Sequence, residues 1–353
     1  MKNILELCLS PDLGGLELFM VKCYRHFNAN IAVAPGKKLD KYIEGEKFLV
    51  KRNKFFPFIP ALKLAKYIDK NEIDVIHFHW TRDIITAVLA KKFSKRKPKI
   101  IQTRNMTMTR FKNDFYHKWL YNNIDAIHAV TYQVKEQLER FIPKKVRPKI
   151  EVVYMGCEIP KKELDINDLK QKYGLKDEFI VGIVGRIEEA KGQWLVIEAL
   201  SRLKNLNIKV LIVGHTMDEA YLNSLKNRVK ELGLEERVIF TGFTKEVNRH
   251  FSLMDVAILA TPRETFGLVI IEAMANQVAV IATNSGGPLE IIDNGKDGLL
   301  FNREVEDLAD KIELLYNDRE LLEKISKNGY KKVQERFEEN KQLEKLYGVI
   351  DEM

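Results

Sequence analysis

Short apolar segments alternate with amphipathic segments along almost the whole chain. In the first half, the apolar runs predict strands at 3–10, 30–36, 47–51, 74–80, 99–104, 126–131 and 150–156. In the second half, they predict strands at 179–187, 208–214, 238–243, 256–261, 278–283 and 298–301. Most segments between them have the spacing of amphipathic helices. Continuously apolar strands that alternate with helices are typical of parallel sheets covered on both faces.

The repeat of this pattern predicts an α/β protein with two doubly wound, Rossmann-like domains. A length of 353 residues also suits two domains better than one. The polar segment 157–178 is the expected boundary, which gives an N-terminal domain at 1–157 and a C-terminal domain at 178–335. Two domains of this kind bind ligands in a cleft between the carboxyl ends of their strands.

The cysteines, the N-terminal sequence and the length of the apolar segments indicate the cellular compartment. The three cysteines (Cys8, Cys23 and Cys157) lie far apart and lack metal-ligand spacing, so neither a disulfide framework nor a zinc site is expected. The N-terminus does not resemble a signal peptide, because Glu6 interrupts its apolar run and Pro11 ends it. No segment reaches the ~20 apolar residues of a membrane helix. We expect a cytoplasmic protein, either free or peripheral on the inner face of a membrane.

Two cations follow a glycine turn at one predicted strand end. Gly185 ends the strand, Arg186 comes next, and Lys191 lies close behind. Cations beside a turn at the carboxyl end of a strand suit a phosphate or a diphosphate. The alternative is a pair of solvated surface cations, and this segment alone gives both interpretations equal weight.

Two glutamates eight positions apart flank the start of another predicted helix. Glu264 lies just before Phe266 and Gly267, and Glu272 lies inside the helix that follows. Carboxylates accept hydrogen bonds from the vicinal hydroxyls of sugars and ribose, and a helix N-terminus favours a phosphate. The pattern thus suits the two ends of a nucleotide-sugar. The alternative is a helix with one N-terminal acid and one unrelated acid.

Taken together, these motifs resemble the family-4 retaining glycosyltransferases of the GT-B fold. The resemblance rests on the E-x7-E pattern, on "VGRIEEAKG", "VIFTGF" and "GKDGLLF", and on the long segment 254–292. It is strong over 180–302 and weaker but collinear in "LGGLE", "DVIHFHW" and "VVYMGCEI" of the first half. It implies two Rossmann-like domains facing each other across a cleft. It also implies that a final helix at 336–353 crosses back to the first domain, with Phe337, Leu343, Leu346 and Tyr347 as its buried face.

The resemblance also implies roles for matching positions. Arg186 and Lys191 would bind the donor diphosphate, Glu264 the sugar hydroxyls and Glu272 the ribose. The other implied donor-binding positions are Gly14, Gly15, Gly185, Gly214, Gly242, Phe243, Phe266, Gly267 and Leu268. Neither a metal nor a cofactor is implied: the chain has no Asp-x-Asp motif, and the two cations and a helix terminus would stabilise the leaving group instead.

The acceptor side is less well defined. Many relatives have a histidine after the strand that corresponds to 99–104, where this chain has Asn105, which cannot act as an acid or a base near neutral pH. His77 and His79 lie two apart on one strand and so face the same side. They could contact an acceptor or bind a ligand, but core histidines at a strand end are the more common case.

Charge is distributed unevenly. Residues 1–150 carry 30 Lys and Arg against 14 Asp and Glu, a net charge of +16, whereas residues 151–353 carry 28 against 36, a net charge of −8. The segments 51–60 and 91–99 combine cations with aromatic residues, which suits an anionic membrane surface. No nucleic-acid module is present, and a solvated basic face is the alternative.

These features predict a retaining glycosyltransferase. It would move a sugar from a UDP-, GDP- or ADP-sugar to a glycan or lipid-linked acceptor in bacterial surface polysaccharide or lipopolysaccharide assembly. Two alternatives remain: a nucleotide-sugar epimerase or hydrolase on the same fold, and a non-catalytic partner subunit. An epimerase or hydrolase needs acid–base groups in the cleft, for which the sequence offers few candidates.

Overall fold

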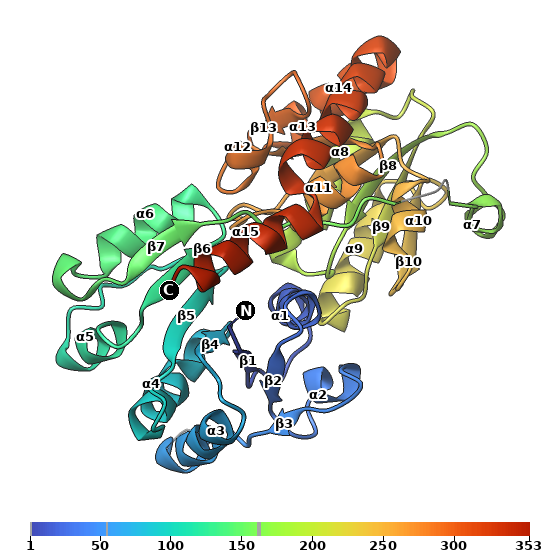
Figure 1. The fold of residues 1–353 in the computed structure, drawn as a ribbon. Coiled ribbons are helices and arrows are strands. Elements are labelled where there is room, and N and C mark those ends of the chain that lie inside the picture. Colours follow the sequence, from blue (N-terminus) through green and yellow to red (C-terminus); the bar gives the residue numbers. More distant parts are fainter. Residues whose placement is uncertain (1, 54–55, 161–163) are drawn as a thin grey trace. The chain divides into compact units, whose positions relative to one another are not determined.

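The computed structural model describes residues 2–53, 56–160 and 164–353, and these form two compact units. Unit 1 consists of Met1–Met155 together with Asn340–Met353, and unit 2 consists of Gly156–Glu339. Each unit is built on one parallel sheet (Figure 1).

Unit 1 contains a seven-stranded sheet with the order β3-β2-β1-β4-β5-β6-β7. All its strand pairs are parallel, and the chain begins at the middle of the sheet, extends to one edge and then returns to build the other. The switch point is therefore between β1 and β4. The strands are β1 (Ile4–Cys8), β2 (Asn30–Val33), β3 (Phe48–Leu49), β4 (Val75–Phe78), β5 (Lys99–Arg104), β6 (Ala126–Ala129) and β7 (Lys149–Val152).

Helices connect these strands. The helices of unit 1 are α1 (Gly15–His26), α2 (Lys38–Tyr42), α3 (Phe58–Lys70), α4 (Ile84–Phe93), α5 (Phe115–Tyr121), α6 (Tyr132–Phe141) and α15 (Glu339–Asp351), with short 3-10 turns η1 (Thr81–Asp83) and η2 (Lys144–Val146). The strand predicted at 47–51 is reduced to two residues.

Unit 2 repeats the design with a six-stranded sheet of order β10-β9-β8-β11-β12-β13. All its pairs are parallel, and its switch point lies between β8 and β11. The strands are β8 (Phe179–Val184), β9 (Ile208–Val213), β10 (Val238–Gly242), β11 (Val256–Leu259), β12 (Ala279–Thr283) and β13 (Leu299–Phe301).

Helices α8 and α13 of unit 2 contact each other, and α11 and α14 contact β12. The helices of unit 2 are α7 (Asn167–Tyr173), α8 (Gln193–Arg202), α9 (Glu219–Glu231), α10 (Val247–Phe251), α11 (Leu268–Ala275), α12 (Pro288–Ile291), α13 (Val305–Asn317) and α14 (Arg319–Lys332), with η3 (Glu189–Lys191) and the π-helical turn Val333–Phe337.

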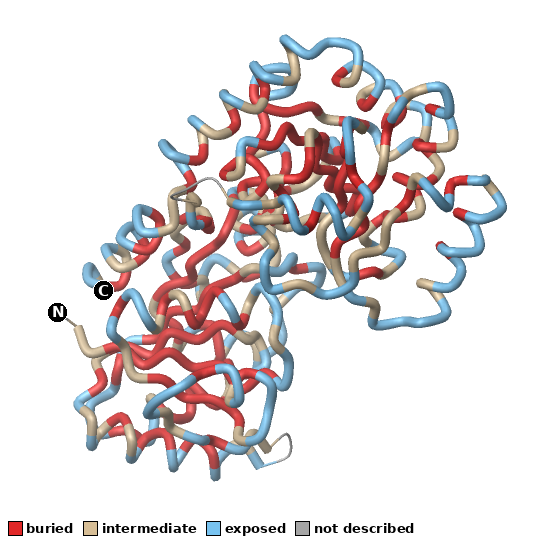
Figure 2. The backbone as a smooth tube through the Cα atoms, turned by 90° about the vertical axis from the view of Figure 1, so that its right-hand side faces the viewer, coloured by how far each residue is buried: buried red, intermediate tan, exposed pale blue. Residues whose placement is uncertain are grey.

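Burial explains the strand composition. The central strands of both sheets are buried along most of their length, while the outward faces of the helices are exposed (Figure 2). A strand covered on both faces has no solvent side, so its sequence is continuously apolar. This is the pattern from which the two sheets were predicted, and both sheets are confirmed.

The final helix belongs to unit 1. Lys2 Nζ donates to the carbonyl oxygen of Ile350 in α15 at 3.3 Å, and the rings of Phe27 and Tyr347 lie 5.6 Å apart. Leu343 and Leu346 are buried in α15, and Tyr347 is half-buried. Phe337 is also buried, but it lies in the π-helical turn before α15.

The expected boundary segment, residues 157–178, includes α7, and its residues 161–163 lie outside the described part of the chain. None of the helices in 2–53, 56–160 and 164–353 combines the length and the apolar character needed to cross a bilayer.

Candidate functional site

Three neighbouring strands of unit 2 end in glycines. Gly185, Gly214 and Gly242 follow or end β8, β9 and β10, and each has a positive φ, of 148°, 148° and 76°. The Gly214 N–H donates to Gly242 O at 3.1 Å, and a Cβ on Gly214 would lie 1.8 Å from Gly185 O. Only glycine fits this spacing, so backbone rather than side chains forms this edge of the sheet.

An ion pair lies at the switch point of the same sheet. Lys191, in the turn η3 after β8, places Nζ 3.3 Å from Oε2 of Glu264, which follows β11. Their side chains are 28% and 22% exposed, so both charges are partly shielded but still accessible to a ligand. The structure thus brings together the residue expected at the donor diphosphate, Lys191, and the residue expected at the donor sugar, Glu264.

The approach of the two loops depends on Gly192. This residue has φ 76°, and a Cβ there would lie 2.8 Å from both the Cβ and the carbonyl oxygen of Ala260 at the end of β11. A larger residue would therefore push η3 away from β11. The glycine that follows Lys191 sets the distance at which Lys191 meets Glu264.

A second pair of glycines supports the loop that carries Glu264. Gly286 and Gly287 follow β12, and the Gly287 N–H donates to Glu264 O at 2.9 Å. A Cβ on Gly286 would lie 2.3 Å from Glu264 O, and one on Gly287 would lie 2.3 Å from Phe266 O. The glycine pair that follows the E-x7-E pattern thus allows two backbones to touch, and this contact fixes the carboxylate of Glu264 relative to the sheet.

Helix α11 begins directly after this loop. Its N-cap, Gly267, has φ 104° and no side chain with which to cap the first turn. The first-turn N–H groups and the positive end of the helix dipole therefore lie next to Glu264 in the chain. Phe266 is buried and packs against Phe337 at 6.0 Å, Leu268 opens the helix, and Glu272 lies in its second turn.

Arg186 extends the positive charge of this edge. Its side chain is 57% exposed, and its Nη2 lies 3.0 Å from Glu188 Oε1. The carbonyl oxygen of Arg186 accepts a hydrogen bond from Gln193 Nε2 at 2.8 Å, which fixes the backbone of the loop but leaves the guanidinium accessible. An exposed, weakly held guanidinium can turn toward an anion.

One aromatic contact at this edge was not predicted from the sequence. The ring of Phe243, which is 67% exposed, lies 5.7 Å from that of His215 in an edge-to-face arrangement. His215 directly follows Gly214, so its position after a strand end was the available signal. The two rings offer an exposed aromatic surface beside the glycine-lined strand ends.

In unit 1, Gly14 and Gly15 occupy the corresponding position after β1. Gly14 is the N-cap of α1, and its N–H donates to Glu17 Oε2 at 2.9 Å. A Cβ on Gly14 would lie 3.5 Å from the same oxygen, so this contact does not itself require glycine. The donor contacts predicted for Gly14 and Gly15 stay predictions.

Asp83 holds the start of this loop. Its Oδ2 accepts a hydrogen bond from the Leu9 N–H at 2.8 Å, and its Oδ1 has no hydrogen-bond partner among the described residues. Complete burial raises the pKa of the carboxyl to about 7, although the hydrogen bond from Leu9 and the charge of Arg52 oppose the shift. Asp83 was not among the residues predicted from the sequence.

His77 and His79, the acceptor-side candidates at the end of β4, are buried, which agrees with the more common interpretation of such a pair. Their exposed fractions are 0% and 1%, and both rings bond to the buried Glu6, so they are core residues in this structure. Burial and the neighbouring His77 lower the pKa of His79 to about 4. Asn105 directly follows β5 and is half-buried, and its proposed contact with the donor sugar stays a prediction.

Comparisons with known proteins agree with the fold and the motifs. A family model for "Glycosyl transferases group 1" matches residues 165–332, and one for "Glycosyltransferase Family 4" matches residues 20–159. The capsular polysaccharide biosynthesis glycosyltransferase CapM of Staphylococcus aureus is 25% identical over 96% of this chain and 94% of its own.

Two further matches complete the comparison. A Campylobacter jejuni enzyme, N-acetylgalactosamine-N,N'-diacetylbacillosaminyl-diphospho-undecaprenol 4-alpha-N-acetylgalactosaminyltransferase, is 29% identical over 69% of this chain and 67% of its own. The Anabaena protein Alr3699/HepE, solved in complex with UDP and glucose, superimposes over the full length of both chains with a TM-score of 0.87 and 21% identity. The fold is GT-B, and the chain belongs to the family-4, or group 1, glycosyltransferases.

The buried Asp83 predicts a measurable pH dependence of stability. Because its folded-state pKa is raised to about 7, the folded protein keeps a proton that the unfolded chain releases near pH 4. Stability is therefore lost as the pH rises from about 4 to about 7, at a rate approaching ~1.4 kcal/mol per pH unit. Asp83→Asn keeps an acceptor for Leu9 but does not titrate.

The free energies of unfolding of wild type and Asp83→Asn should be compared by urea titration from pH 4.5 to pH 8. We expect the variant to become more stable relative to wild type across this range. A difference that does not change with pH would show that Asp83 is already ionised in the folded protein.

Proposed function

We propose that the protein is a retaining glycosyltransferase that transfers a sugar from a nucleoside-diphosphate sugar to a glycan or lipid-linked acceptor. The observation that carries this proposal is the Lys191–Glu264 ion pair, at the switch point of the unit 2 sheet and next to the N-terminus of α11. Ligands bind doubly wound sheets at such switch points. The setting we propose is bacterial surface polysaccharide or lipopolysaccharide assembly.

The diphosphate of the donor fits the positive groups of this edge. Lys191, Arg186 and the first-turn N–H groups of α11 supply two full charges and the end of a helix dipole. These groups stabilise the negative charge that grows on the departing diphosphate as the glycosidic bond breaks. We therefore propose a reaction that requires neither a metal ion nor a cofactor at the diphosphate.

The two glutamates fit the two sugars of the donor. Glu264, held by Gly287 and paired with Lys191, would accept hydrogen bonds from hydroxyls of the transferred sugar. Glu272, in the second turn of α11, would accept hydrogen bonds from the ribose. The ion pair with Lys191 would hold the Glu264 side chain in place until the phosphate provides Lys191 with a second anionic partner.

Transfer with retention needs no enzymic nucleophile in this scheme. The acceptor hydroxyl attacks the face of the sugar from which the diphosphate leaves, and the leaving phosphate oxygen takes the hydroxyl proton. The C. jejuni relative is named for an alpha linkage. Formation of an alpha product from an alpha-linked nucleotide-sugar is net retention, which is the stereochemistry that we propose.

The relatives also support the substrate classes. The Anabaena protein was solved with UDP and glucose, CapM is named for capsular polysaccharide biosynthesis, and the C. jejuni relative is named for a diphospho-undecaprenol-linked acceptor. We propose the same classes for this chain: a UDP-, GDP- or ADP-sugar as donor and a growing glycan, free or lipid-linked, as acceptor.

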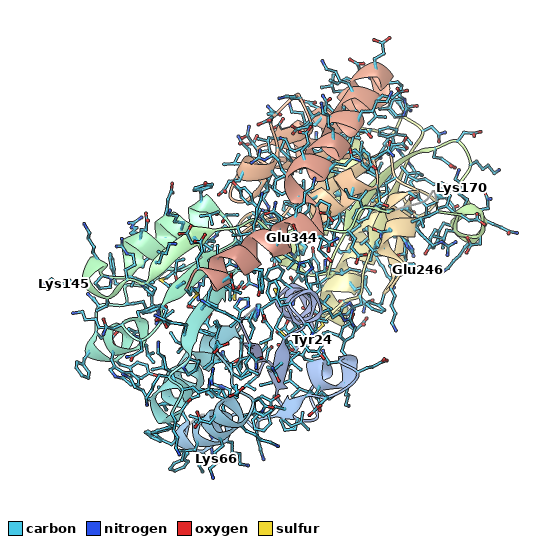
Figure 3. All side chains as sticks on the ribbon, viewed as in Figure 1. Tyr24, Lys66, Lys145, Lys170, Glu246 and Glu344 are labelled. Atoms are coloured by element: carbon cyan, nitrogen blue, oxygen red, sulfur yellow. The ribbon has the colours of Figure 1, made fainter. Side chains whose placement is uncertain are left out.

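An apolar and basic surface of unit 1 fits a membrane-linked acceptor. Phe58, Ile59 and Leu62 of α3 are 55%, 57% and 46% exposed, and Phe93 of α4 packs against Phe58 at 6.3 Å. Exposed lysines surround these residues, including Lys66, whose side chain projects from α3 in Figure 3. Apolar side chains ringed by cations are suited to an anionic lipid surface. We propose peripheral binding of this surface, although Phe55 of the same segment lies outside the described residues.

The first test concerns the diphosphate. Lys191→Ala should weaken binding of the cognate nucleoside diphosphate by about 1.5–3 kcal/mol, because it removes a charge-assisted hydrogen bond. Lys204→Ala, at an exposed position of the same unit, is the control and should bind as wild type does. Calorimetric titration with UDP, GDP and ADP measures the effect, and equal affinities of wild type and Lys191→Ala would contradict the assignment.

The second test separates the two glutamates. Glu264→Gln should weaken the sugar-bearing donor much more than the free nucleoside diphosphate, because the partner proposed for Glu264 is the sugar. Glu272→Gln should weaken both ligands to a similar extent, because both contain ribose. Calorimetry without added metal measures the affinity of each variant for the sugar-bearing donor and for the free nucleoside diphosphate.

If both variants lose the same affinity for both ligands, the proposed division between Glu264 and Glu272 is wrong. Turnover assays with and without an acceptor extract distinguish the alternatives. Sugar release that needs no acceptor indicates a hydrolase, and a changed sugar on the same nucleotide indicates an epimerase.

The third test concerns the membrane. Each lysine near an anionic surface contributes about 1 kcal/mol, and salt screens this attraction over roughly 8 Å. Replacing Lys63, Lys66 and Lys92 with Ser should therefore reduce sedimentation with anionic liposomes at low salt. Lys91 and Arg96 are left unchanged because they pair with Asp125 and Asp74 at 2.6 Å each.

The matched control replaces Lys204, Lys230 and Lys324 of unit 2, which are equally exposed, and should leave sedimentation unchanged. The double variant Phe58→Ser and Ile59→Ser should lose the part of the binding that persists in high salt. If wild type sediments equally with neutral and anionic liposomes, a soluble acceptor is the better proposal.

A further inference from the structure

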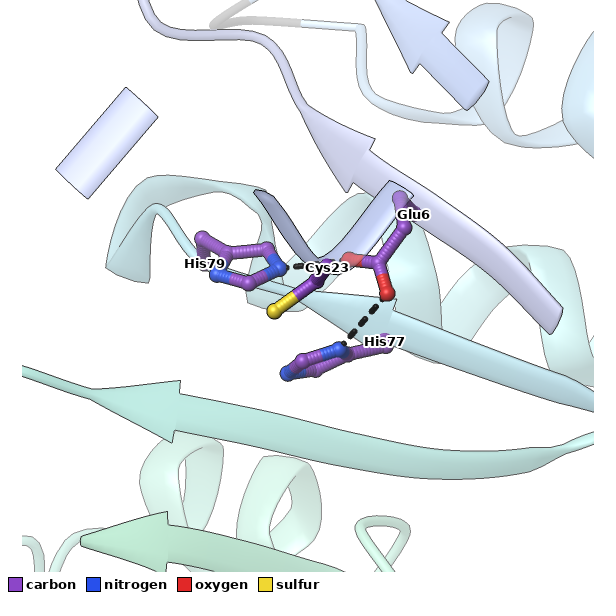
Figure 4. A group of neighbouring side chains, drawn as sticks. All are labelled: Glu6, Cys23, His77 and His79. Atoms are coloured by element: carbon purple, nitrogen blue, oxygen red, sulfur yellow. Dashed lines mark hydrogen bonds and ion pairs between the residues drawn. The ribbon is translucent and has the colours of Figure 1, made fainter. Parts of the chain in front are cut away.

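Four buried side chains with metal-binding atoms meet at the centre of unit 1 (Figure 4). Glu6 comes from β1, His77 and His79 come from the end of β4, and Cys23 comes from α1, which packs against β1. One donor atom from each side chain lies within 4.8 Å of the others. Glu6 and Cys23 are far from the two histidines in the sequence, which explains why no metal-ligand spacing was found there.

Glu6 connects the two histidines. Its Oε1 lies 2.9 Å from His77 Nδ1, and its Oε2 lies 2.6 Å from His79 Nε2. The two imidazole rings are 4.2 Å apart between their centroids. His79 Nδ1 has no hydrogen-bond partner in the described part of the chain, so the polar groups of this site are incompletely satisfied.

Hydrogen bonds further along the sheet fix which atom of His77 faces Glu6. His128 Nε2 lies 2.7 Å from the carbonyl oxygen of Val153 and must donate to it. Burial lowers the pKa of His128 to about 3, so its Nδ1 carries no proton and accepts from the Thr103 hydroxyl at 2.9 Å. Thr103 has then used its only proton and accepts from His77 Nε2 at 2.6 Å.

This chain of bonds leaves Nδ1 of His77 directed at the carboxylate of Glu6. A bare ring nitrogen beside a carboxylate is unfavourable, and an isolated carboxylate is costly in a fully buried site. A metal ion held by all four side chains would lie between this nitrogen and the carboxylate and would bind both.

We propose that Glu6, Cys23, His77 and His79 bind one divalent transition-metal ion, with Zn²⁺ as the ion that best suits the ligands. One thiolate, two imidazoles and one carboxylate form a four-coordinate set of the kind that zinc prefers. The outer nitrogen of His77 already donates to Thr103, and ligating histidines typically make such a bond. Binding would release the Cys23 thiol proton, because the thiolate is the form that binds a metal.

The geometry requires only small movements. Ligand atoms around a tetrahedral zinc with bonds of about 2.0–2.3 Å lie roughly 3.3–3.8 Å apart. The two contacts of Glu6 would therefore lengthen by about half an ångström or slightly more, and the most distant pair would close by about one ångström. Side-chain rotations supply such movements without a change in the sheet.

The role that follows is structural. The ion would fasten α1 to β1 and β4, and α1 begins directly after the Gly14–Gly15 loop. It would thus stabilise the carboxyl edge of the unit 1 sheet. The site is formed by unit 1 alone, and no metal is proposed at the diphosphate of the donor.

The full-length protein, with any histidine tag removed, should be assayed for metal by elemental analysis and then titrated with Zn²⁺ and Co²⁺ after extraction under mild acid. We expect one equivalent per chain, together with the thiolate-to-cobalt charge-transfer band and the intense visible bands of tetrahedral cobalt. Zn²⁺ should also raise the melting temperature of the apoprotein.

Cys23→Ser should abolish the charge-transfer band, and His79→Gln should weaken metal binding at least tenfold. Cys8→Ser is the matched control, because Cys8 is also buried in unit 1 but is not part of the cluster, and it should keep the spectrum. If the variants fail to fold, the spectrum of wild type still decides. The proposal is overturned if wild type neither copurifies with metal nor binds added Co²⁺, or if Cys23→Ser keeps the thiolate band.

Discussion

The close backbone contact between loops at the carboxyl edge of the unit 2 sheet is the constraint on which the candidate donor site depends. Gly192 lets the turn after β8 touch Ala260, and Gly286 and Gly287 let the loop after β12 touch the backbone of Glu264 and Phe266. Each added Cβ would lie within 3 Å of another atom. The charged side chains meet only because these glycines allow the loops that carry them to pack so closely.

This constraint explains how a few side chains can serve one ligand. Lys191 and Glu264 come from loops after different strands, yet they form an ion pair at the switch point between β8 and β11. The N-terminus of α11 follows Glu264 by three residues and is fixed by the same contacts. A diphosphate beside Lys191 would thus have the sugar at Glu264, and the leaving group would meet positive charge that is already in place.

Much of this could be predicted from the sequence. The two sheets were visible as apolar runs, because a strand covered on both faces shows no polar alternation. Arg186, Lys191 and Glu264 could be recognised because they follow strand ends, and Glu272 because it lies eight positions after Glu264, in a pattern shared with a known family. Such signals are local: each lies within a few residues of the element that positions it.

Contacts between distant strands could not be predicted in the same way. His77 and His79 gave a strand-face pattern, but their burial depends on Glu6, which lies 71 and 73 positions away. Nothing in the sequence marked Asp83 as a special residue, because it accepts its hydrogen bond from the N–H of Leu9, which follows a different strand. Sequence spacing does not report which strands become neighbours, so the buried polar cluster and the perturbed carboxyl needed the structure.

The most direct test of the account is hydrogen exchange of wild type, measured by mass spectrometry with and without its cognate nucleoside diphosphate. The account predicts slower exchange in two segments of unit 2, the turn at 185–192 and the start of α11 at 266–270, with little change at the opposite edge of that sheet. Protection that excludes both segments would contradict the assignment of the donor site to this edge.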